Sequence, residues 1–256
     1  MANGSSFTAV NLALDIGNTH IKAGLFRKDQ AVDFARWPLR QWTEVLLYAR
    51  QNDVQQVVLA AVVPLEATFA QQLRRQVALL LELTDQTPLP FTNAYQTPRT
   101  LGKDRLAAVA GAHALWPNQN CLIVDCGTCI KYDLLTAEGV YLGGNISPGA
   151  SMRLTALHIL TARLPLVSVE MPTDPIGRST TTALQNGALR GAAIEIEGFI
   201  QLFRRQFSPL RIVLTGGDAT FFRAAISVDL FVEPHLTLYG LNHLLLFYTN
   251  THHQPD

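Results

Sequence analysis

Residues 12–22 read LALDIGNTHIK, and residues 122–131 read LIVDCGTCIK. The two stretches align with a single one-residue gap. Each holds an apolar run, an Asp, a turn Gly, a Thr and an Ile-Lys pair. Such a run, ended by Asp and Gly, predicts a buried strand followed by a tight turn. The repeat therefore predicts two similar halves, and two facing copies would place two carboxylates and two Gly/Thr turns around one cleft suited to metal-bound polyphosphate.

Composition restricts the class of protein. The chain has 256 residues, 48% of them apolar and 16% charged, which is typical of a compact globular protein. Net charge is zero and no basic stripe follows the sequence, so nucleic-acid binding is disfavoured. Residues 1–6 lack the charge and apolar stretch of a signal peptide, and no run approaches the roughly 20 apolar residues of a membrane span. We expect a cytoplasmic enzyme without a membrane segment.

Three cysteines lie close together, at Cys121, Cys126 and Cys129. The last two form a Cys-x-x-Cys pair, which is a pattern found in redox and zinc sites. A second pair of metal ligands is missing, however, and Cys126 falls inside the Asp-x-Gly turn. The pattern favours a structural role for all three.

Apolar periodicity and turn residues predict a mixed α/β succession in both halves. The first half is expected to contain strands at 12–15, 19–26, 31–37 and 54–63, helices at 42–51, 65–81 and 104–116, and a broken loop at 83–101. The second is expected to contain strands at 121–125, 130–135, 140–146, 212–214 and 230–232, a flexible loop at 143–149, and helices at 150–160, 180–206 and from 236. Gly187, Gly191 and Gly198 predict tight packing of the long helix. We place the domains at 7–116 and 117–251.

The first turn carries groups that suit phosphate. Asp15 supplies a carboxylate, Gly17 permits a tight turn with exposed backbone N–H groups, and Lys22 could reach the same phosphates. The alternative is an ordinary β-hairpin, in which the Asp and Asn side chains only hydrogen-bond to nearby backbone groups. The presence of two copies in register disfavours this alternative. No P-loop is present, because Gly102-Lys103 is followed by Asp104, and no Gly-x-Gly-x-x-Gly opens a helix.

The paired turns resemble those of the superfamily of sugar and acetate kinases, actin and heat-shock chaperone ATPases. Within it, Leu101-Gly102-Lys103-Asp104-Arg105, preceded by Tyr95, resembles the Gly-x-Asp-Arg signature of type III pantothenate kinases. Further motifs agree in order: Asp15 to Thr19, Asp125 to Thr128, Gly143-Gly144 to Pro148-Gly149, Gly177 to Thr180, and Thr215-Gly216-Gly217. His20, Lys103 and Ser179 depart from common family residues without removing a required chemical group.

The resemblance implies an α/β fold of two tandem ribonuclease-H-like domains with an ATP cleft between them. It implies phosphorylation of pantothenate to 4'-phosphopantothenate, the first step of coenzyme A biosynthesis, with an alcohol group as the acceptor. Another small-molecule kinase of the superfamily and a non-catalytic regulatory relative remain alternatives. Catalysis is favoured because Asp15, Asp104 and Asp125 are all present.

The resemblance also implies roles for individual residues. Asp104 would be the catalytic base, although Asp is also a favoured N-cap residue. ATP would be held by Asp15, Ile16, Gly17, Asn18, Thr19, His20, Ile21, Lys22 and Thr128, with Mg²⁺ near Asp15. Pantothenate would be held by Tyr95, Gly102, Lys103, Asp104, Arg105 and Thr180, with Thr180 contributed by the neighbouring subunit of a homodimer. Asp125 would bind a monovalent cation, K⁺ or NH₄⁺, which predicts higher activity in K⁺ than in Na⁺.

Overall fold

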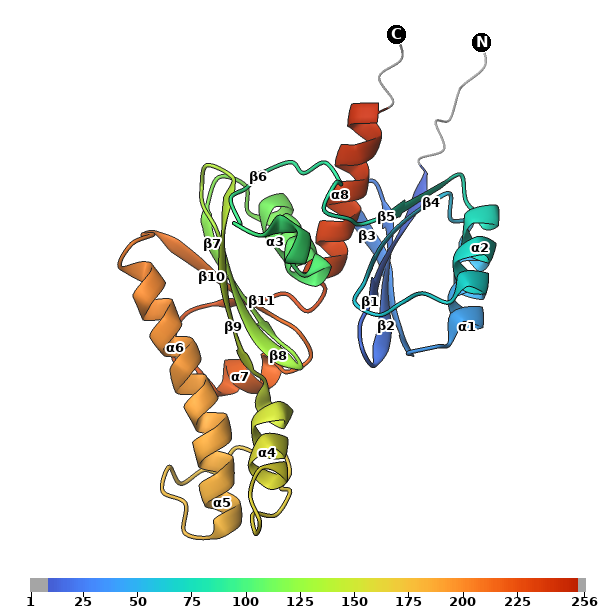
Figure 1. Ribbon diagram of the computed structural model, residues 1–256. Helices are drawn as coiled ribbons and strands as arrows, with labels where there is room; N and C mark the ends of the chain where they lie inside the picture. The colour runs from blue at the N-terminus through green and yellow to red at the C-terminus, as the bar shows by residue number, and fades with distance from the viewer. Residues whose placement is uncertain (1–8, 253–256) are drawn as a thin grey trace, which may run out of the picture. The chain divides into compact units, whose positions relative to one another are not determined.

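A computed structural model describes residues 9–252, and Figure 1 traces them as a ribbon. Contacts divide the chain into two compact α/β units. The first unit comprises the chain up to Pro117 together with His235 onward, and the second comprises Asn118–Pro234. The polar segment at residues 1–6 lies outside the described residues. Within residues 9–252, no helix combines the length and apolar character that a membrane span requires.

The first unit is built on a mixed sheet. Its strands lie in the order β3-β2-β1-β4-β5, with antiparallel pairing among β1, β2 and β3 and parallel pairing from β1 through β4 to β5. The bounds are β1 (Val10–Ile16), β2 (His20–Arg27), β3 (Gln30–Pro38), β4 (Gln56–Ala61) and β5 (Leu79–Glu82). Because β2 turns back along β1 while β4 runs parallel to β1, the β1–β2 hairpin turn lies at the same end of the sheet as the end of β4.

The second unit repeats this arrangement. Its strands follow the order β11-β10-β7-β8-β9, again antiparallel on one side of β7 and parallel on the other. The bounds are β7 (Asn120–Cys126), β8 (Cys129–Leu135), β9 (Val140–Pro148), β10 (Leu210–Thr215) and β11 (Phe231–Val232). Strands β1 and β7 have the same pattern of buried positions along their length. The predicted duplication is thus confirmed, and the two α/β units with mixed sheets agree with the expected fold class.

Helices cover the first sheet through a shared apolar core. Helix α1 (Trp42–Gln51) has the predicted bounds, whereas α2 (Ala67–Gln76) is shorter than the predicted helix at 65–81. Val77 adopts an extended conformation that ends α2, and the leucines after it pair with β4 as β5. The prediction was wrong there because a run of leucines fits either element, and the strand partner decides. Phe69 of α2 packs with the strands, fully buried.

Strand β9 is longer than expected. The segment 143–149, predicted to be a flexible loop, continues β9 through Pro148 and pairs with β8. Gly144 is required there, because a Cβ at this position would lie 1.6 Å from the Tyr132 carbonyl oxygen. The glycines, which suggested a loop in the sequence, are therefore needed because two strands approach each other closely here. Helix α4 (Ala150–Ile159) follows at once and begins where predicted.

The predicted long helix is present, but its glycines do not lie in close contact with other elements. It runs as α5 (Thr180–Gln185), a π-helical segment η2 (Asn186–Arg190) and α6 (Gly191–Arg204). A Cβ on Gly187, Gly191 or Gly198 would meet nothing within 4 Å, so the expected tight packing at these positions was wrong. Apolar residues make the contacts to the sheet instead, among them Leu189, Ala192, Ile196 and Ile200.

The terminal helix belongs with the first unit. Between β5 and α3 (Lys103–Leu115) lie β6 (Thr92–Asn93) and the 3₁₀ turn η1 (Pro98–Thr100), and α7 (Ala219–Ala225) lies between β10 and β11. Helix α8 (Leu236–His252) packs on α3 at two glycines. A Cβ on Gly240 would lie 1.8 Å from the Ala107 carbonyl oxygen, and one on Gly111 would lie 2.2 Å from the Leu236 carbonyl oxygen. The close contact explains why α8 joins the unit of residues 7–116 and not the rest of 117–251.

A pair of histidines joins the same two helices. His113 Nδ1 of α3 lies 3.1 Å from His243 Nε2 of α8. Burial lowers the pKa of His113, and burial together with the charge of His113 lowers the pKa of His243 to about 4. Neither ring is therefore readily protonated in the folded protein.

We expect this pair to make stability fall with acidification. The unfolded chain, with histidine pKa values near 6.5, binds more protons than the folded chain between about pH 4 and pH 6.5. The free energy of unfolding should rise with pH through that window, by about 1 to 2 kcal/mol after allowance for partial exposure of the rings. Thermal unfolding of the native protein and of His243→Gln between pH 4.5 and 7.5 measures this pH dependence. The free energy of unfolding of His243→Gln should change less with pH than that of the native protein. The control variant at the exposed His252, His252→Gln, should keep the native pH dependence. Equal slopes in all three proteins would contradict the assignment.

Candidate active site

The first hairpin turn presents polar groups at the end of β1. Asp15 faces Lys22 across the β1–β2 ladder, and the turn closes with a hydrogen bond from the Gly17 N–H to the His20 carbonyl, 3.0 Å. Asn18 and Thr19 between them are exposed. The buried neighbours Ile16 and Ile21 anchor the turn in the core. The structure therefore brings the first predicted phosphate-binding segment, 15–22, together as one rigid hairpin.

His20 makes contacts on its own hairpin. Its Nδ1 lies 2.9 Å from the Thr19 hydroxyl and 3.1 Å from the Arg36 guanidinium of β3. The ring therefore orders one side of the turn.

The second turn is the same hairpin with one residue fewer. The Gly127 N–H donates to the Cys129 carbonyl at 3.1 Å, and Thr128 is exposed at the tip. Asp125 faces Lys131 across the β7–β8 ladder, as Asp15 faces Lys22. Lys131 Nζ lies 2.6 Å from Asp125 Oδ2, and both side chains are only 15% exposed. Sequence reasoning noted this lysine in the repeat but did not predict its ion pair.

Two glycine segments pack against this second turn. The Gly149 N–H, at the start of α4, donates to the Thr128 carbonyl at 3.1 Å, and a Cβ on Gly149 would lie 2.2 Å from the Gly127 carbonyl oxygen. Gly216 has a φ of +92°, and a Cβ there would lie 2.4 Å from both Asp125 Oδ1 and the Cys126 carbonyl oxygen. Three motifs far apart in the sequence thus meet in one place. A helix N-terminus beside a glycine turn offers backbone N–H groups to an anion.

The Gly-x-Asp-Arg segment forms the start of α3. Gly102 is the N-cap and Asp104 lies in the first turn, so the alternative that Asp104 is the N-cap residue is wrong. A Cβ on Gly102 would lie 2.5 Å from Asp104 Oδ1, which puts the carboxylate directly over this glycine. The first turn of a helix favours negative charge, so the ionised form of Asp104 suits its position.

Arg105 and Tyr95 lie together in the same unit. The Arg105 side chain is buried, with the residue 4% exposed, and its guanidinium carbon is 5.4 Å from the centre of the Tyr95 ring. The Asn93 side chain fixes the Tyr95 backbone by accepting its N–H at 3.0 Å. Lys103 is directed differently, since its Nζ lies 3.9 Å from Glu82 Oε1 in a partly exposed ion pair. The structure therefore joins Tyr95 to Arg105 and turns Lys103 toward the surface.

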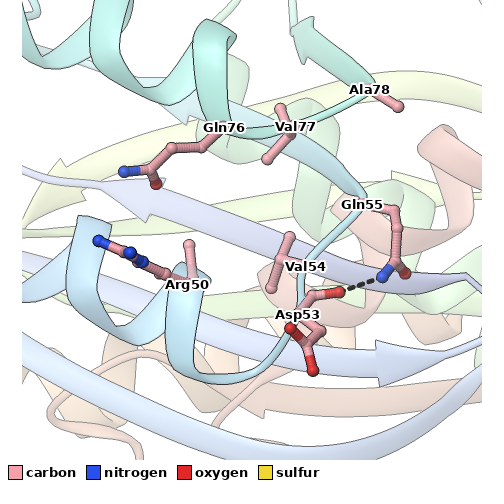
Figure 2. A pocket seen from close by; sticks show the side chains of 8 residues that line it. Arg50, Asp53, Val54, Gln55, Gln76, Val77 and Ala78 are labelled. Carbon is pink, nitrogen blue, oxygen red and sulfur yellow. Dashed lines mark hydrogen bonds between the residues drawn. The ribbon is translucent and has the colours of Figure 1, made fainter.

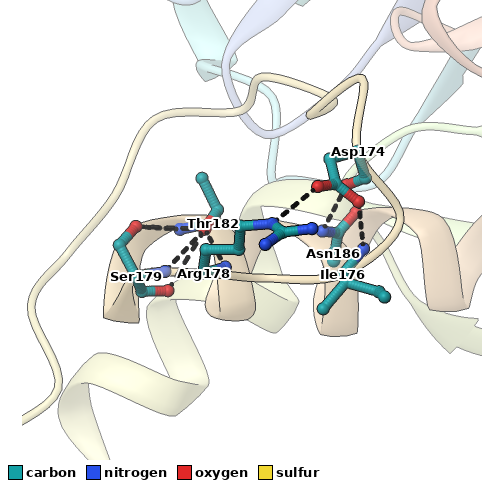
Figure 3. A network of polar contacts seen from close by, with 6 residues as sticks. All are labelled: Asp174, Ile176, Arg178, Ser179, Thr182 and Asn186. Carbon is teal, nitrogen blue, oxygen red and sulfur yellow. Dashed lines mark hydrogen bonds and ion pairs between the residues drawn. The ribbon is translucent and has the colours of Figure 1, made fainter.

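Thr180 lies in a separate segment of the second unit, and Figure 3 shows the polar contacts of its neighbours Ser179 and Thr182. It is the exposed first residue of α5, and Ser179 before it is the N-cap of a capping box with Thr182. The loop leading to it is held by Asp174, whose carboxylate accepts the Ile176 N–H at 2.9 Å and the Arg178 Nε–H at 3.0 Å. These hydrogen bonds, from the Ile176 backbone first and then from Arg178, lower the pKa of Asp174. The segment around Thr180 is thus ordered by its own contacts.

A cluster of hydrogen bonds around Glu195 joins the elements next to the second turn. It was not predicted from the sequence. Glu195 of α6 accepts hydrogen bonds from the Tyr132 hydroxyl at 2.9 Å, the Ser147 hydroxyl at 2.5 Å and Arg153 Nη2 at 2.6 Å. Burial opposes ionisation of Glu195, but the hydrogen bonds outweigh burial and lower its pKa. The cluster ties β8, β9, α4 and α6 together next to Gly149. No local signal could reveal it, because the partners are 42 to 63 residues away.

The pocket in Figure 2 lies away from these turns. It forms where β4 and β5 begin, whereas Asp15 lies where the parallel strand β1 ends, so the two are at opposite ends of the sheet. The figure also shows the Gln55 amide donating to the Asp53 carbonyl within it. Its lining is Ala49, Arg50, Asp53, Val54, Gln55, Gln76, Val77 and Ala78. We assign no chemistry to it.

The cysteines have the character of core residues. Cys121 and Cys126 are buried and Cys129 is partly buried. Burial raises the pKa of Cys121 to about 11, and burial followed by the charges of Asp125 and Asp218 raises that of Cys126 further. Neither thiol forms the reactive thiolate at neutral pH. Over residues 9–252, no group of three or more His, Cys, Asp or Glu side chains is placed to hold a metal ion.

Comparison with known proteins identifies clear relatives. The model of the family described as type III pantothenate kinase matches residues 11–202. A type III pantothenate kinase of Phocaeicola vulgatus is 39% identical over 238 residues, covering 93% of this chain and 98% of the relative. One of Bacteroides fragilis is 39% identical over 236 residues, covering 92% and 97%.

Solved structures share the fold at lower identity. A Baf family transcriptional activator of Campylobacter jejuni, described as conserved and putative, aligns with a TM-score of 0.61 and 20% identity, covering 93% of this chain and 99% of that one. The activator of the 2-hydroxyisocaproyl-CoA dehydratase from Clostridium difficile, solved with bound ADPNP, aligns with a TM-score of 0.53 and 15% identity, covering 94% and 95%. These likenesses concern the fold alone.

Proposed function

The chain belongs to the type III pantothenate kinase family, and from this membership we propose that it transfers a phosphoryl group from ATP to the primary hydroxyl of pantothenate. The product is 4'-phosphopantothenate, so the reaction is the first step of coenzyme A biosynthesis. The observation that carries the proposal is the 39% identity, over 93% of this chain, to a type III pantothenate kinase, in a chain that has Asp15, Asp104 and Asp125. We also propose that the enzyme works in the cytoplasm, where ATP and Mg²⁺ are available.

Asp104 is the proposed general base. Phosphoryl transfer depends on positioning and charge neutralisation, with a carboxylate that accepts the proton of the attacking hydroxyl. Asp104 suits this role because its carboxylate is fixed over Gly102 in the first turn of α3. The adjacent Arg105 guanidinium, buried against Tyr95, adds positive charge and a flat surface on the same element. Tyr95, Gly102, Lys103 and Arg105 are accordingly the proposed residues that hold pantothenate in the first unit.

The two hairpin turns are the proposed ATP-binding elements. Glycine turns and exposed hydroxyls allow close approach of phosphate oxygens to backbone N–H groups. The first turn offers Asp15 to Lys22, and the second offers Thr128 beside the N-terminus of α4.

Mg²⁺ fits the carboxylate of Asp15. Oxygen ligands from one or two carboxylates, with several retained waters, are what Mg²⁺ prefers. Asp15 is a partly exposed carboxylate at a strand end, beside the proposed phosphate-binding turn. When bound, Mg²⁺ would neutralise charge on the ATP phosphates.

A soluble K⁺ or NH₄⁺ fits Asp125 poorly. The resemblance implies such a cation at this carboxylate, but Lys131 Nζ already lies 2.6 Å from Oδ2. The other oxygen lies against Gly216. The groups around Asp125 are therefore those of an ion pair and do not form a site for a free cation.

A homodimer with Thr180 at the interface is part of the proposal. Thr180 is exposed on a loop and helix already ordered by Asp174 and Ser179, which suits a contact with a second subunit. Exposed apolar residues of the second unit supply area for such a contact: Ile159, Leu160, Leu166, Ile176 and Ile194.

A coupled assay of ATP consumption tests the function. We expect ATP turnover with Mg²⁺ to depend on pantothenate, and mass spectrometry to find one added phosphoryl group on pantothenate. Turnover with a sugar or another small acid, and none with pantothenate, would favour a different kinase of the superfamily. Nucleotide binding without turnover on any acceptor would favour a regulatory relative, the second alternative.

A further inference from the structure

One oxygen of the Asp125 carboxylate is taken by a charged side chain of the same unit. Asp125 and Lys131 are opposite residues of the antiparallel pair β7–β8, so their side chains leave the same face of the sheet. Lys131 Nζ lies 2.6 Å from Oδ2, and each side chain is 15% exposed. At that separation the contact is a charge-assisted hydrogen bond as well as an ion pair.

The other oxygen is covered by a turn of the backbone. Strand β10 runs parallel to β7 with Thr215 opposite Asp125, and the chain then turns through Gly216 at a φ of +92°. A Cβ on Gly216 would lie 2.4 Å from Oδ1, so only a glycine leaves room for this oxygen. A free cation would have to share a carboxylate that already holds an ammonium on one oxygen and the Gly216 turn against the other.

A lysine side chain can supply what a monovalent cation supplies. Its head group is an ammonium with one positive charge and three N–H donors, chemically close to NH₄⁺. Because the chain carries it on β8, opposite Asp125, it stays at high effective concentration without any salt. A second cation on the same carboxylate would be repelled by the first.

We propose that Lys131 is a built-in monovalent cation: its ammonium takes the place of K⁺ or NH₄⁺ at Asp125, and nucleotide binding and turnover do not need a soluble monovalent cation. Lys131 is thus a positioning residue, which acts through Asp125 on the Gly127-Thr128 turn and on the Gly216 turn packed against it. The inference rests on the proposed function, since it concerns the second nucleotide-binding turn.

The native protein is tested first. Calorimetric titration with a non-hydrolysable ATP analogue and Mg²⁺, in KCl, NaCl and tetramethylammonium chloride at equal ionic strength, should give Kd values that agree within about twofold. The kcat/KM for pantothenate should show the same insensitivity. A native Kd that is about tenfold tighter in K⁺ than in tetramethylammonium would overturn the proposal.

A matched pair of variants then tests the lysine itself. Lys131→Gln should weaken analogue binding about tenfold or more in tetramethylammonium, and K⁺ or NH₄⁺ should restore most of the loss. Lys28→Gln removes the same charge from the exposed β2–β3 turn and should match native protein in every salt. A purely structural role for Lys131 would give a loss that no cation restores, which overturns the proposal, as does native affinity for Lys131→Gln in all three salts.

The proposed function can fail separately. If the native protein binds nucleotide but does not turn over pantothenate in any salt, the pantothenate assignment fails while the titrations still decide the role of Lys131. If Lys131→Gln does not fold, the salt dependence of the native protein decides it. No nucleotide binding in any salt would overturn both.

Discussion

Asp104→Asn is expected to lower kcat for pantothenate phosphorylation by about 10²- to 10⁴-fold, the usual contribution of a general base. Asparagine has nearly the same shape, so its side chain can still lie over Gly102 in the first turn of α3. It cannot take up the proton of the attacking hydroxyl. Nucleotide affinity, measured by calorimetry, should change much less than kcat.

The control is a carboxylate of the same unit that lies outside the site. Asp85 is exposed in the loop after β5, and Asp85→Asn should keep full activity. Circular dichroism should show that both variants melt like the native protein, because the loss of one charge at a helix N-terminus costs only about 0.3 to 1 kcal/mol. Full turnover by Asp104→Asn would eliminate the base assignment.

Gly240→Ala is expected to cause a large loss of stability for a single added methyl group. The added Cβ would lie 1.8 Å from the Ala107 carbonyl oxygen and 2.5 Å from the Gly111 nitrogen, both backbone atoms of α3 that cannot move aside alone. Helices α3 and α8 would have to separate, at a cost of about 3 kcal/mol, the upper part of the usual range for overpacking. Thermal unfolding followed by circular dichroism should show a midpoint about 6 to 12 °C lower.

Gly198→Ala is the matched control. It lies in the interior of α6, is exposed, and has nothing within 4 Å of an added Cβ. The same substitution there should raise stability by about 0.5 to 1 kcal/mol, since alanine favours a helix over glycine. Equal effects of the two substitutions would show that helix propensity, and not contact between α3 and α8, governs position 240.

Local patterns predicted most of the elements. The repeat at Asp15 and Asp125 was visible because each hairpin is specified by adjacent residues, and α1 was predicted with its observed bounds for the same reason. The roles of Asp104 and Thr180 came from motif resemblance and stay predictions.

Long-range pairing decided what the sequence could not predict. Leu79–Glu82 is a strand because β4 lies beside it, and the Gly143-Gly144 pair lies in a strand because Leu134 and Asp133 of β8 lie opposite. The same holds within the site. Neither the Lys131 ion pair nor the Glu195 cluster has a local signature, since each depends on strand register or on a helix that returns to the sheet.

The packing of α8 on α3 has a consequence for synthesis of the protein. The second unit is a continuous segment, Asn118–Pro234, so all of its parts have been made before α8 begins to emerge from the ribosome. The first unit starts earlier but also needs helix α8, Leu236–His252, which follows the second unit in the sequence. The order of completion is thus the reverse of the order of translation, and until α8 has been made the chain lacks the helix that packs against Gly111 of α3. A nascent chain halted before residue 236 would contain every residue of the second unit but would lack the helix that completes the first.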